Sequence, residues 1–124
     1  MPVQVTVDRS KKLVITTYSG QVTNADVACQ ISEIKRQAPY DPDCRVITDF
    51  THVTLFDISS DQIRSVADSK SPLASASRVM VAPSDVAYGT SRMFQMLAGH
   101  TRPNITVVRS MEEAYAVLGI QPKH

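Results

Sequence analysis

The stretch that decides the fold reads Arg78-Val79-Met80-Val81-Ala82-Pro83-Ser84-Asp85. Its first five residues are mainly apolar, which is typical of a short strand buried in a sheet. Pro83 ends this strand, and Ser84 with Asp85 opens a helix, because both side chains suit the free N–H groups at a helix start. We expect the helix to end at Gly99. Its inner face is predicted to hold Val86, Met93, Phe94 and Leu97.

The same alternation of strand and helix continues on both sides of this unit. Before it, residues 44–50 form a second β-rich run, residues 51–58 are predicted to be a connection, and Ser59 to Gln62 has the form of a capping box at a helix start. After it, residues 105–108 form the last strand. A second capping box, Ser110 to Glu113, begins the last helix.

The N-terminal part of the chain predicts a β-hairpin followed by a helix. Residues 3–7 alternate apolar with polar side chains, and residues 13–18 are β-branched and aromatic, with Gly20 closing the second strand. The period then changes to that of a helix, which Thr23 or Asn24 caps. The apolar face of this helix consists of Val27, Ile31, Ile34 and Ala38, and Pro39 ends it.

These elements give the order β-β-α-β-α-β-α-β-α. That order predicts an α/β sandwich in which right-handed crossovers make most of the sheet parallel. The hairpin adds an antiparallel N-terminal edge strand to this mixed, mainly parallel sheet. We expect a single domain over residues 1–124.

Composition excludes several classes of protein. Thirteen Lys and Arg residues against twelve Asp and Glu residues give a formal net charge of +1, so bulk charge does not favour nucleic acid. No apolar run approaches the roughly 20 residues that cross a bilayer. Cys29 and Cys44 do not make a disulfide scaffold or a metal-binding spacing. We therefore expect a cytoplasmic protein with no membrane segment, no nucleic-acid partner, no metal and no cofactor.

Residues 45–60, together with the order of elements, resemble the SpoIIAA-like or STAS-like superfamily, which includes the anti-sigma-factor antagonists. In the antagonists, an apolar strand is followed by Asp-Ser-Ser/Thr-Gly at a helix start, and a partner kinase phosphorylates a serine there. The resemblance matches Asp57 to that aspartate and makes Ser59 or Ser60 the candidate phosphoacceptor. Two positions depart from the pattern, since Ile58 replaces the first serine and Ser60 the glycine.

A second stretch, Gly89 to Phe94, has a Gly-x-x-Arg-Met-aromatic pattern that is similar to an uncharacterised bacterial branch of this superfamily. The resemblance implies a non-enzymatic regulatory domain that binds a protein partner, such as a kinase or a regulator. Phosphorylation of Ser59 would add about −1.5 to −2 charge near Asp57 and Asp61 and would release that partner. The alternative is that Ser59 is only the cap of its helix.

Polar residues after the predicted strands are candidates for partner or ligand binding. Asp49 and Ser84 follow neighbouring strands, whose carboxyl ends share one edge of a parallel sheet. The candidates there and on the following helix are Asp49, Thr51, Asp57, Ser84, Asp85, Tyr88 and Arg92. The alternative is local, because Asp49 can accept backbone N–H groups in its own loop and Ser84 can cap a helix.

Three further hypotheses stay open. A basic group made of Arg92, His100, Arg102 and Arg109 is either an anion site or solvated surface charge. A small-molecule or lipid carrier would use a crevice beside the helix that holds Tyr88 and Met96, and the same two side chains suit a homodimer contact instead. An enzyme would need Asp49 and His52 to face each other, and no catalytic motif supports one.

Overall fold

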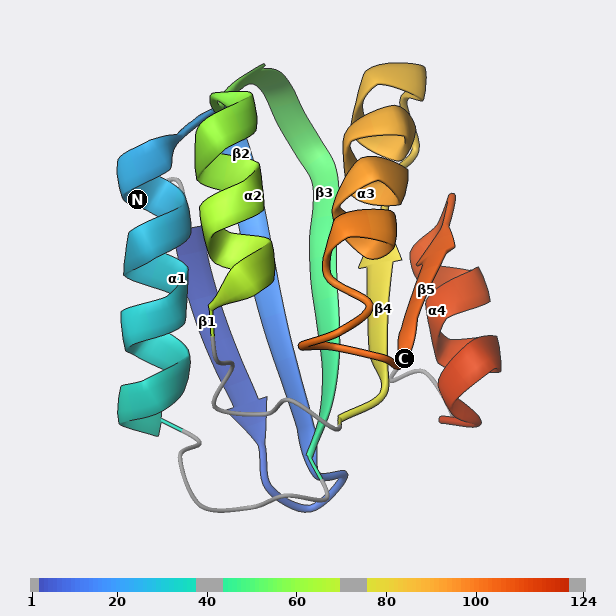
Figure 1. Cartoon of the computed structure of the whole chain (residues 1–124). Coiled ribbons are helices and arrows are strands. Elements are labelled where there is room, and N and C mark those ends of the chain that lie inside the picture. Colours follow the sequence, from blue (N-terminus) through green and yellow to red (C-terminus); the bar gives the residue numbers. More distant parts are fainter. Residues whose placement is uncertain (1–2, 38–43, 70–75, 121–124) are drawn as a thin grey trace.

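The computed structural model describes residues 3–37, 44–69 and 76–120 (Figure 1). Its elements follow in the order β1 (Val3–Asp8), β2 (Leu13–Thr23), α1 (Asn24–Gln37), β3 (Arg45–Asp57), α2 (Ser60–Asp68), β4 (Arg78–Val81), α3 (Asp85–Leu97), β5 (Ile105–Val108) and α4 (Met111–Leu118). This order confirms the one predicted from the sequence. The predicted end of α1, with Ala38 and Pro39, lies outside the described residues.

The five strands form one sheet in the order β1-β2-β3-β4-β5. β1 pairs with β2 in antiparallel fashion, and the other three pairings are parallel, as expected for an edge hairpin followed by crossovers. One row across the parallel strands joins Val14, Val46, Arg78 and Ile105. The register therefore places a charged residue in a row that is otherwise apolar.

Helices cover both faces of the sheet. In Figure 1, α1, α2 and α3 lie in front of the strands, and α4 lies beside β5. Val79 and Val81 of β4 pack with Ala114 of α4, whereas Met80 packs with residues of α3 on the opposite face. Because side chains alternate along a strand, Arg78 lies on the same face as Met80, beneath α1–α3.

Two strands run further than the sequence predicted. Residues 51–57, expected to be a connection, continue β3, and β2 passes Gly20 to reach Thr23, which pairs with Asp57. Gly20 has a φ of +68°, and the register of β2 against β3 shifts on both sides of it. The glycine thus makes a bulge within β2 rather than ending the strand.

The buried face of α3 differs from the predicted one. Ala87 and Ser91 are the buried residues of this helix, whereas Val86 is 67% and Met93 38% exposed. Phe94 and Leu97 are half-buried. Small side chains at 87 and 91 let the helix axis approach the sheet closely, and this contact decides which face turns inward.

The predicted helix caps are confirmed. The hydroxyl oxygens of Ser59, Ser84 and Ser110 each accept the backbone N–H three residues further on, at 3.1 Å. Thr23 precedes α1, and its backbone N–H donates to Asp26 Oδ2 at 2.8 Å.

No helix in the described part of the chain is long and apolar enough to cross a membrane.

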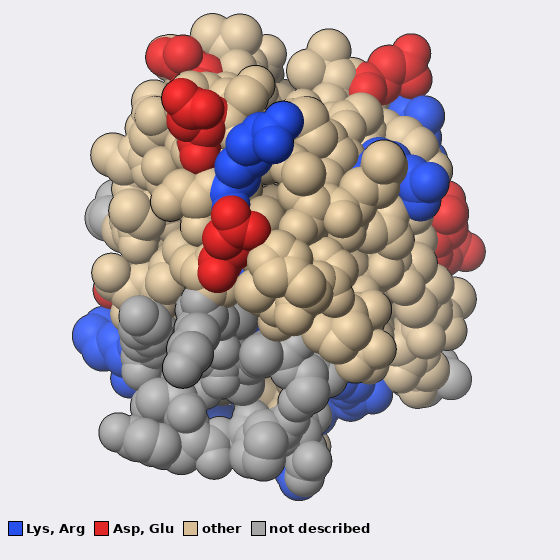
Figure 2. Space-filling model, in the orientation of Figure 1, with Lys and Arg blue, Asp and Glu red and all other residues tan. Residues whose placement is uncertain are grey.

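Charged side chains are scattered over the face that α1, α2 and α3 present. Figure 2 shows Lys and Arg interspersed with Asp and Glu among mainly uncharged residues on this side. The visible face therefore carries no large patch of one sign in the part that the structure describes.

Candidate functional site

A cavity of about 110 Å³ lies between the sheet and helices α1, α2 and α3, and it is partly open to solvent. Its walls are mainly apolar. Val22 and Phe50 contribute from the strands, Ile31 from α1, Ile63 from α2 and Phe94 from α3. This is the cavity that a small, largely apolar molecule would enter.

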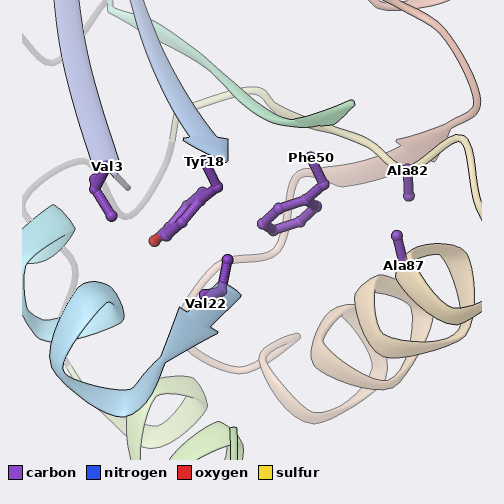
Figure 3. Packing of buried hydrophobic residues seen from close by; sticks show 6 residues of the cluster. All are labelled: Val3, Tyr18, Val22, Phe50, Ala82 and Ala87. Carbon is purple, nitrogen blue, oxygen red and sulfur yellow. The ribbon is translucent and has the colours of Figure 1, made fainter. Parts of the chain in front are cut away.

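Three aromatic side chains of the cavity wall, Tyr18, Phe50 and Phe56, pack against one another. Figure 3 shows Tyr18 and Phe50 side by side, with Val3 and Val22 near the tyrosine. The Tyr18 and Phe50 ring centroids are 5.3 Å apart, and Phe50 meets Phe56 edge-on at 5.2 Å. These contacts hold the rings of the cavity wall in place.

A short chain of polar groups crosses the same region. The Tyr18 hydroxyl donates to Gln30 Oε1 at 2.6 Å, and Gln30 Nε2 donates to Thr16 Oγ1 at 3.4 Å. Burial, with the nearby Asp26 carboxylate as a smaller cause, raises the pKa of Tyr18 well above its usual value. The phenol therefore stays neutral and remains a hydrogen-bond donor.

Two arginines also line the cavity, and both are buried. Arg102 is 4% exposed, and its Nη1 donates to Val66 O at 3.0 Å and Ser69 O at 3.1 Å, at the C-terminal end of α2. Arg78 is 9% exposed. Burial first, and then the Arg102 charge, lowers the pKa of Arg78 to about 10. The region therefore holds two like charges in a poorly solvated place.

Ser91 adds an unusual polar group to the lining. Its side chain is fully buried, and within the described residues no partner lies at hydrogen-bond distance from its Oγ. A buried hydroxyl without a partner costs free energy. Ser91 is therefore a donor and acceptor that a molecule in the cavity can use.

Sequence reasoning missed Arg78, Ser91 and the burial of Arg102. Arg102 was expected to be either an anion site or a solvated charge, and it is neither exposed nor grouped with the other basic residues. Only the position of Arg78 could have been found from the sequence. It lies two residues before Met80 in the predicted strand, so both side chains are on the same face of the sheet. Nothing in the local sequence marks Ser91, since its burial depends on how α3 rotates against the sheet.

Asp49, the first predicted binding residue, makes a local contact at its place in β3. The Asp49 carboxylate accepts the backbone N–H and the hydroxyl of Thr51, which is the local alternative. Asp57 lies about 26 Å further along β3, at about 3.3 Å per residue, so these two aspartates do not share a site. Asp49 and His52 share no hydrogen bond or ion pair in the described structure. In residues 3–37, 44–69 and 76–120, no three His, Cys, Asp or Glu residues group as metal ligands.

The predicted residues near α3 make local contacts outside the cavity. Ser84 caps the helix, and Asp85 pairs with Arg109 at 3.1 Å. The Arg109 guanidinium lies 4.0 Å from the centre of the Tyr88 ring. Arg92 is exposed and donates to Gln95 Oε1 at 2.8 Å. Residues 90, 91 and 94 of this helix line the cavity, whereas Tyr88 and Met96 do not, and the carrier hypothesis stays a prediction.

The predicted basic group is divided in space. His100 pairs with Asp68 at 3.0 Å and Arg109 with Asp85, while Arg102 is buried against α2. His100 and Arg109 thus each have an acidic partner, and Arg102 contacts α2. The residues therefore do not combine into a surface anion site.

The two candidate phosphoacceptors lie at the start of α2. Ser59 and Ser60 are both exposed. Ser59 Oγ accepts the N–H of Gln62, and the Ser59 backbone N–H donates to Asn24 Oδ1 at 3.3 Å. Asp57 accepts a hydrogen bond from Gln21 at 3.2 Å. The capping role of Ser59 is confirmed, and its phosphorylation stays a prediction.

Comparisons with known proteins identify the fold of this chain. No protein-family model matches the sequence, and no curated protein does. One solved structure that is similar is an uncharacterised protein of the DUF3478 family with a SpoIIAA-like fold, from Shewanella loihica PV-4. It is 12% identical, with a TM-score of 0.60, over 94% of this chain and 93% of that chain. The chain therefore has a SpoIIAA-like, STAS-like fold, as the sequence predicted.

Proposed function

We propose that this chain is a non-enzymatic STAS-like binding domain that holds a small amphipathic molecule between the sheet and α1–α3. The observation that carries the proposal is the cavity of about 110 Å³, with apolar walls and a few buried polar groups. That combination is usual for ligand sites, in which apolar area supplies affinity and polar groups fix orientation. Among the described residues of the cavity wall, no nucleophile with an adjacent base supports a reaction.

The size of the cavity limits the ligand. An apolar cavity of about 150 Å³ in another protein holds benzene. A cavity of about 110 Å³ therefore suits about four or five non-hydrogen atoms, and the rest of a larger molecule would lie toward solvent. A long acyl chain would have to extend out of the cavity.

The test is binding of 1-pentanol, followed by NMR of methyl groups. We expect saturable shifts at the methyls of Ile63 and Met80, which line the cavity, and none at Val117, which is exposed on α4. Val66→Phe fills the cavity and should weaken pentanol binding at least tenfold. Val86→Phe is the matched control, because Val86 is exposed on α3. Absence of shifts at the lining methyls, or equal binding by Val66→Phe, would contradict the proposal.

A second candidate function is binding of a protein partner, such as a kinase or regulator, under control of Ser59 or Ser60. What supports it is the exposed position of both serines at the start of α2. Asp57 and Asp61 nearby would make an added phosphate repulsive. Because α2 also lines the cavity, such a change would act close to the bound molecule.

Peptide mapping of residues 45–64 from the protein's own cells tests this second function. Ser59→Asn separates the two roles of the serine, since asparagine caps a helix as well as serine does and cannot accept phosphate in this reaction. We expect Ser59→Asn to keep the stability of the protein and to lose the modification and any partner release. Partner release that survives in both Ser59→Asn and Ser60→Ala would overturn the switch.

A further inference from the structure

Thr48 places a hydroxyl on the side of the cavity that the sheet forms. It lies in β3, the middle strand, and is 8% exposed. It lines the cavity, and its partners across the neighbouring strands are Thr16 and Met80. Because paired residues point to the same face of a sheet, Thr48 lies beneath α1–α3, where Met80 packs. The small part of Thr48 that stays accessible therefore faces the cavity.

The Thr48 hydroxyl has no hydrogen-bond partner in residues 3–37, 44–69 and 76–120. Gln30 Nε2 donates instead to the hydroxyl of Thr16, at 3.4 Å, and Gln30 Oε1 accepts the hydroxyl of Tyr18. Thr16 is the neighbour of Thr48 on β2, and paired strands lie about 4.8 Å apart. A hydroxyl that is nine-tenths buried loses free energy when it lacks a partner, so a molecule in the cavity gains by supplying one.

The surroundings of Thr48 favour a neutral partner. Its two cross-strand neighbours are uncharged, and burial raises the pKa of Tyr18, so the phenol of the adjacent polar chain is neutral too. The arginines of the wall have partners within the chain, since Arg102 donates to carbonyls of α2 and Arg78 is not free. A charged group placed at Thr48 would lose its hydration, whereas a neutral hydroxyl loses less and can donate or accept there.

We infer that the cavity takes the hydroxyl end of a small uncharged aliphatic alcohol, which hydrogen-bonds to the Thr48 hydroxyl while its alkyl chain lies among the apolar side chains. Each hydroxyl has one donor and two acceptor positions, so either partner can donate. The cavity holds about four or five non-hydrogen atoms, so the far end of a longer chain lies toward solvent. This inference rests on the proposed function and adds to it the head group of the ligand and its orientation.

The charge of the head group is tested with three molecules on the intact protein at neutral pH: 1-pentanol, pentanoate and pentylamine. Their affinities are measured from the NMR shifts of the methyl groups that line the cavity. We expect both charged molecules to bind about tenfold more weakly than 1-pentanol, or weaker still, because each must lose the hydration of its charge. If either charged molecule binds as tightly as 1-pentanol, the inference is wrong.

Thr48→Val assigns the hydrogen bond to its residue. The substitution replaces the hydroxyl by a methyl group and keeps a β-branched side chain in the strand. We expect it to weaken 1-pentanol about fivefold, for one hydrogen bond between neutral groups, and to leave n-pentane within about twofold. Thr48→Ser keeps the hydroxyl and should keep the affinity for 1-pentanol. Thr54→Val is the matched control, since Thr54 is exposed on the same strand, and it should change neither affinity.

Nuclear Overhauser effects between ligand and protein test the orientation. The C1 protons of 1-pentanol should give stronger effects to the methyl group of Thr48 than the terminal methyl group of the ligand does. The reverse order would place the ligand hydroxyl toward solvent and would overturn the inference.

The outcomes separate this inference from the proposed function. If 1-pentanol binds, but Thr48→Val weakens it no more than it weakens n-pentane, the cavity holds a ligand and the hydrogen bond to Thr48 is wrong. If 1-pentanol shifts none of the lining methyl groups, both fail. If Thr48→Val does not fold, the order of the three affinities and the orientation of 1-pentanol in the unaltered protein decide the question.

Discussion

The Tyr18 hydroxyl donates a hydrogen bond of 2.6 Å to Gln30 Oε1, and so ties the second strand to the first helix. Tyr18 is 2% exposed, and its ring packs on Phe50. Burial therefore favours the neutral phenol over the phenolate, and the pKa of Tyr18 is raised. This contact links the packing of the cavity wall to the alkaline stability of the protein.

Tyr18→Phe is predicted to change how stability depends on pH. In the unfolded chain the phenol loses its proton near pH 10, whereas folded Tyr18 keeps it to higher pH. The folded state then binds more protons, so the contribution of Tyr18 to stability is full below pH 10 and falls as pH rises above it. The decline is about 1.4 kcal/mol per pH unit.

Urea unfolding from pH 8 to pH 11 measures this effect. Below pH 10, Tyr18→Phe should be less stable than the parent by about 1 kcal/mol, for the lost hydrogen bond. The difference should shrink above pH 10 and be near zero about one pH unit higher. Arg78 titrates in both proteins and so cancels in the comparison. A difference that stays constant over the whole range would contradict the prediction.

Substitution of Gly20 and of Gly89 by alanine gives a paired test of backbone strain. A Cβ added at either position meets nothing within 4 Å. Gly20 has a φ of +68° in β2, so Gly20→Ala should lower the free energy of unfolding by about 1 kcal/mol. Gly89 lies inside α3, so Gly89→Ala should raise it by about 1 kcal/mol. Thermal or urea unfolding gives both signs, and a change of the same sign in both variants would show that backbone conformation is not the cause.

The sequence predicts well those features that depend on local chemistry, namely the helix caps and the order of the elements. The caps at Ser59 and Ser110 need only a side chain that reaches an N–H three residues further on. The order of strands and helices follows from periodicity and from punctuation such as Pro83. Both features were therefore accessible before the structure.

What the sequence does not predict depends on distant partners. The extension of β3 to Asp57 is stabilised by pairing with β2, whose bulge at Gly20 resembles a strand end when read locally. The apolar Val86 and Met93 suggested one inner face for α3, yet close packing selected Ala87 and Ser91. The cavity arises from three helices and the sheet together, so no single segment indicates it.

Arg102 carries the last prediction, which concerns the attachment of α2. Its guanidinium donates to the carbonyl oxygens of Val66 and Ser69 at the C-terminal end of α2, where Val66 O also accepts the Ser69 backbone N–H and hydroxyl. Arg102→Met keeps an apolar stem against Phe94 and removes these donors. We expect it to lower the free energy of unfolding by about 2 kcal/mol, since hydrogen bonds to charged groups contribute about 1.5–3 kcal/mol.

Amide hydrogen exchange distinguishes this local role from general destabilisation. Exchange should accelerate most at residues of the second half of α2, and less in α4, which packs on the other face of the sheet. Arg64→Met is the control on the same helix, and because Arg64 is exposed it should change stability by no more than about 0.5 kcal/mol. If Arg102→Met shows no preferential exchange in α2, the arginine does not hold that helix.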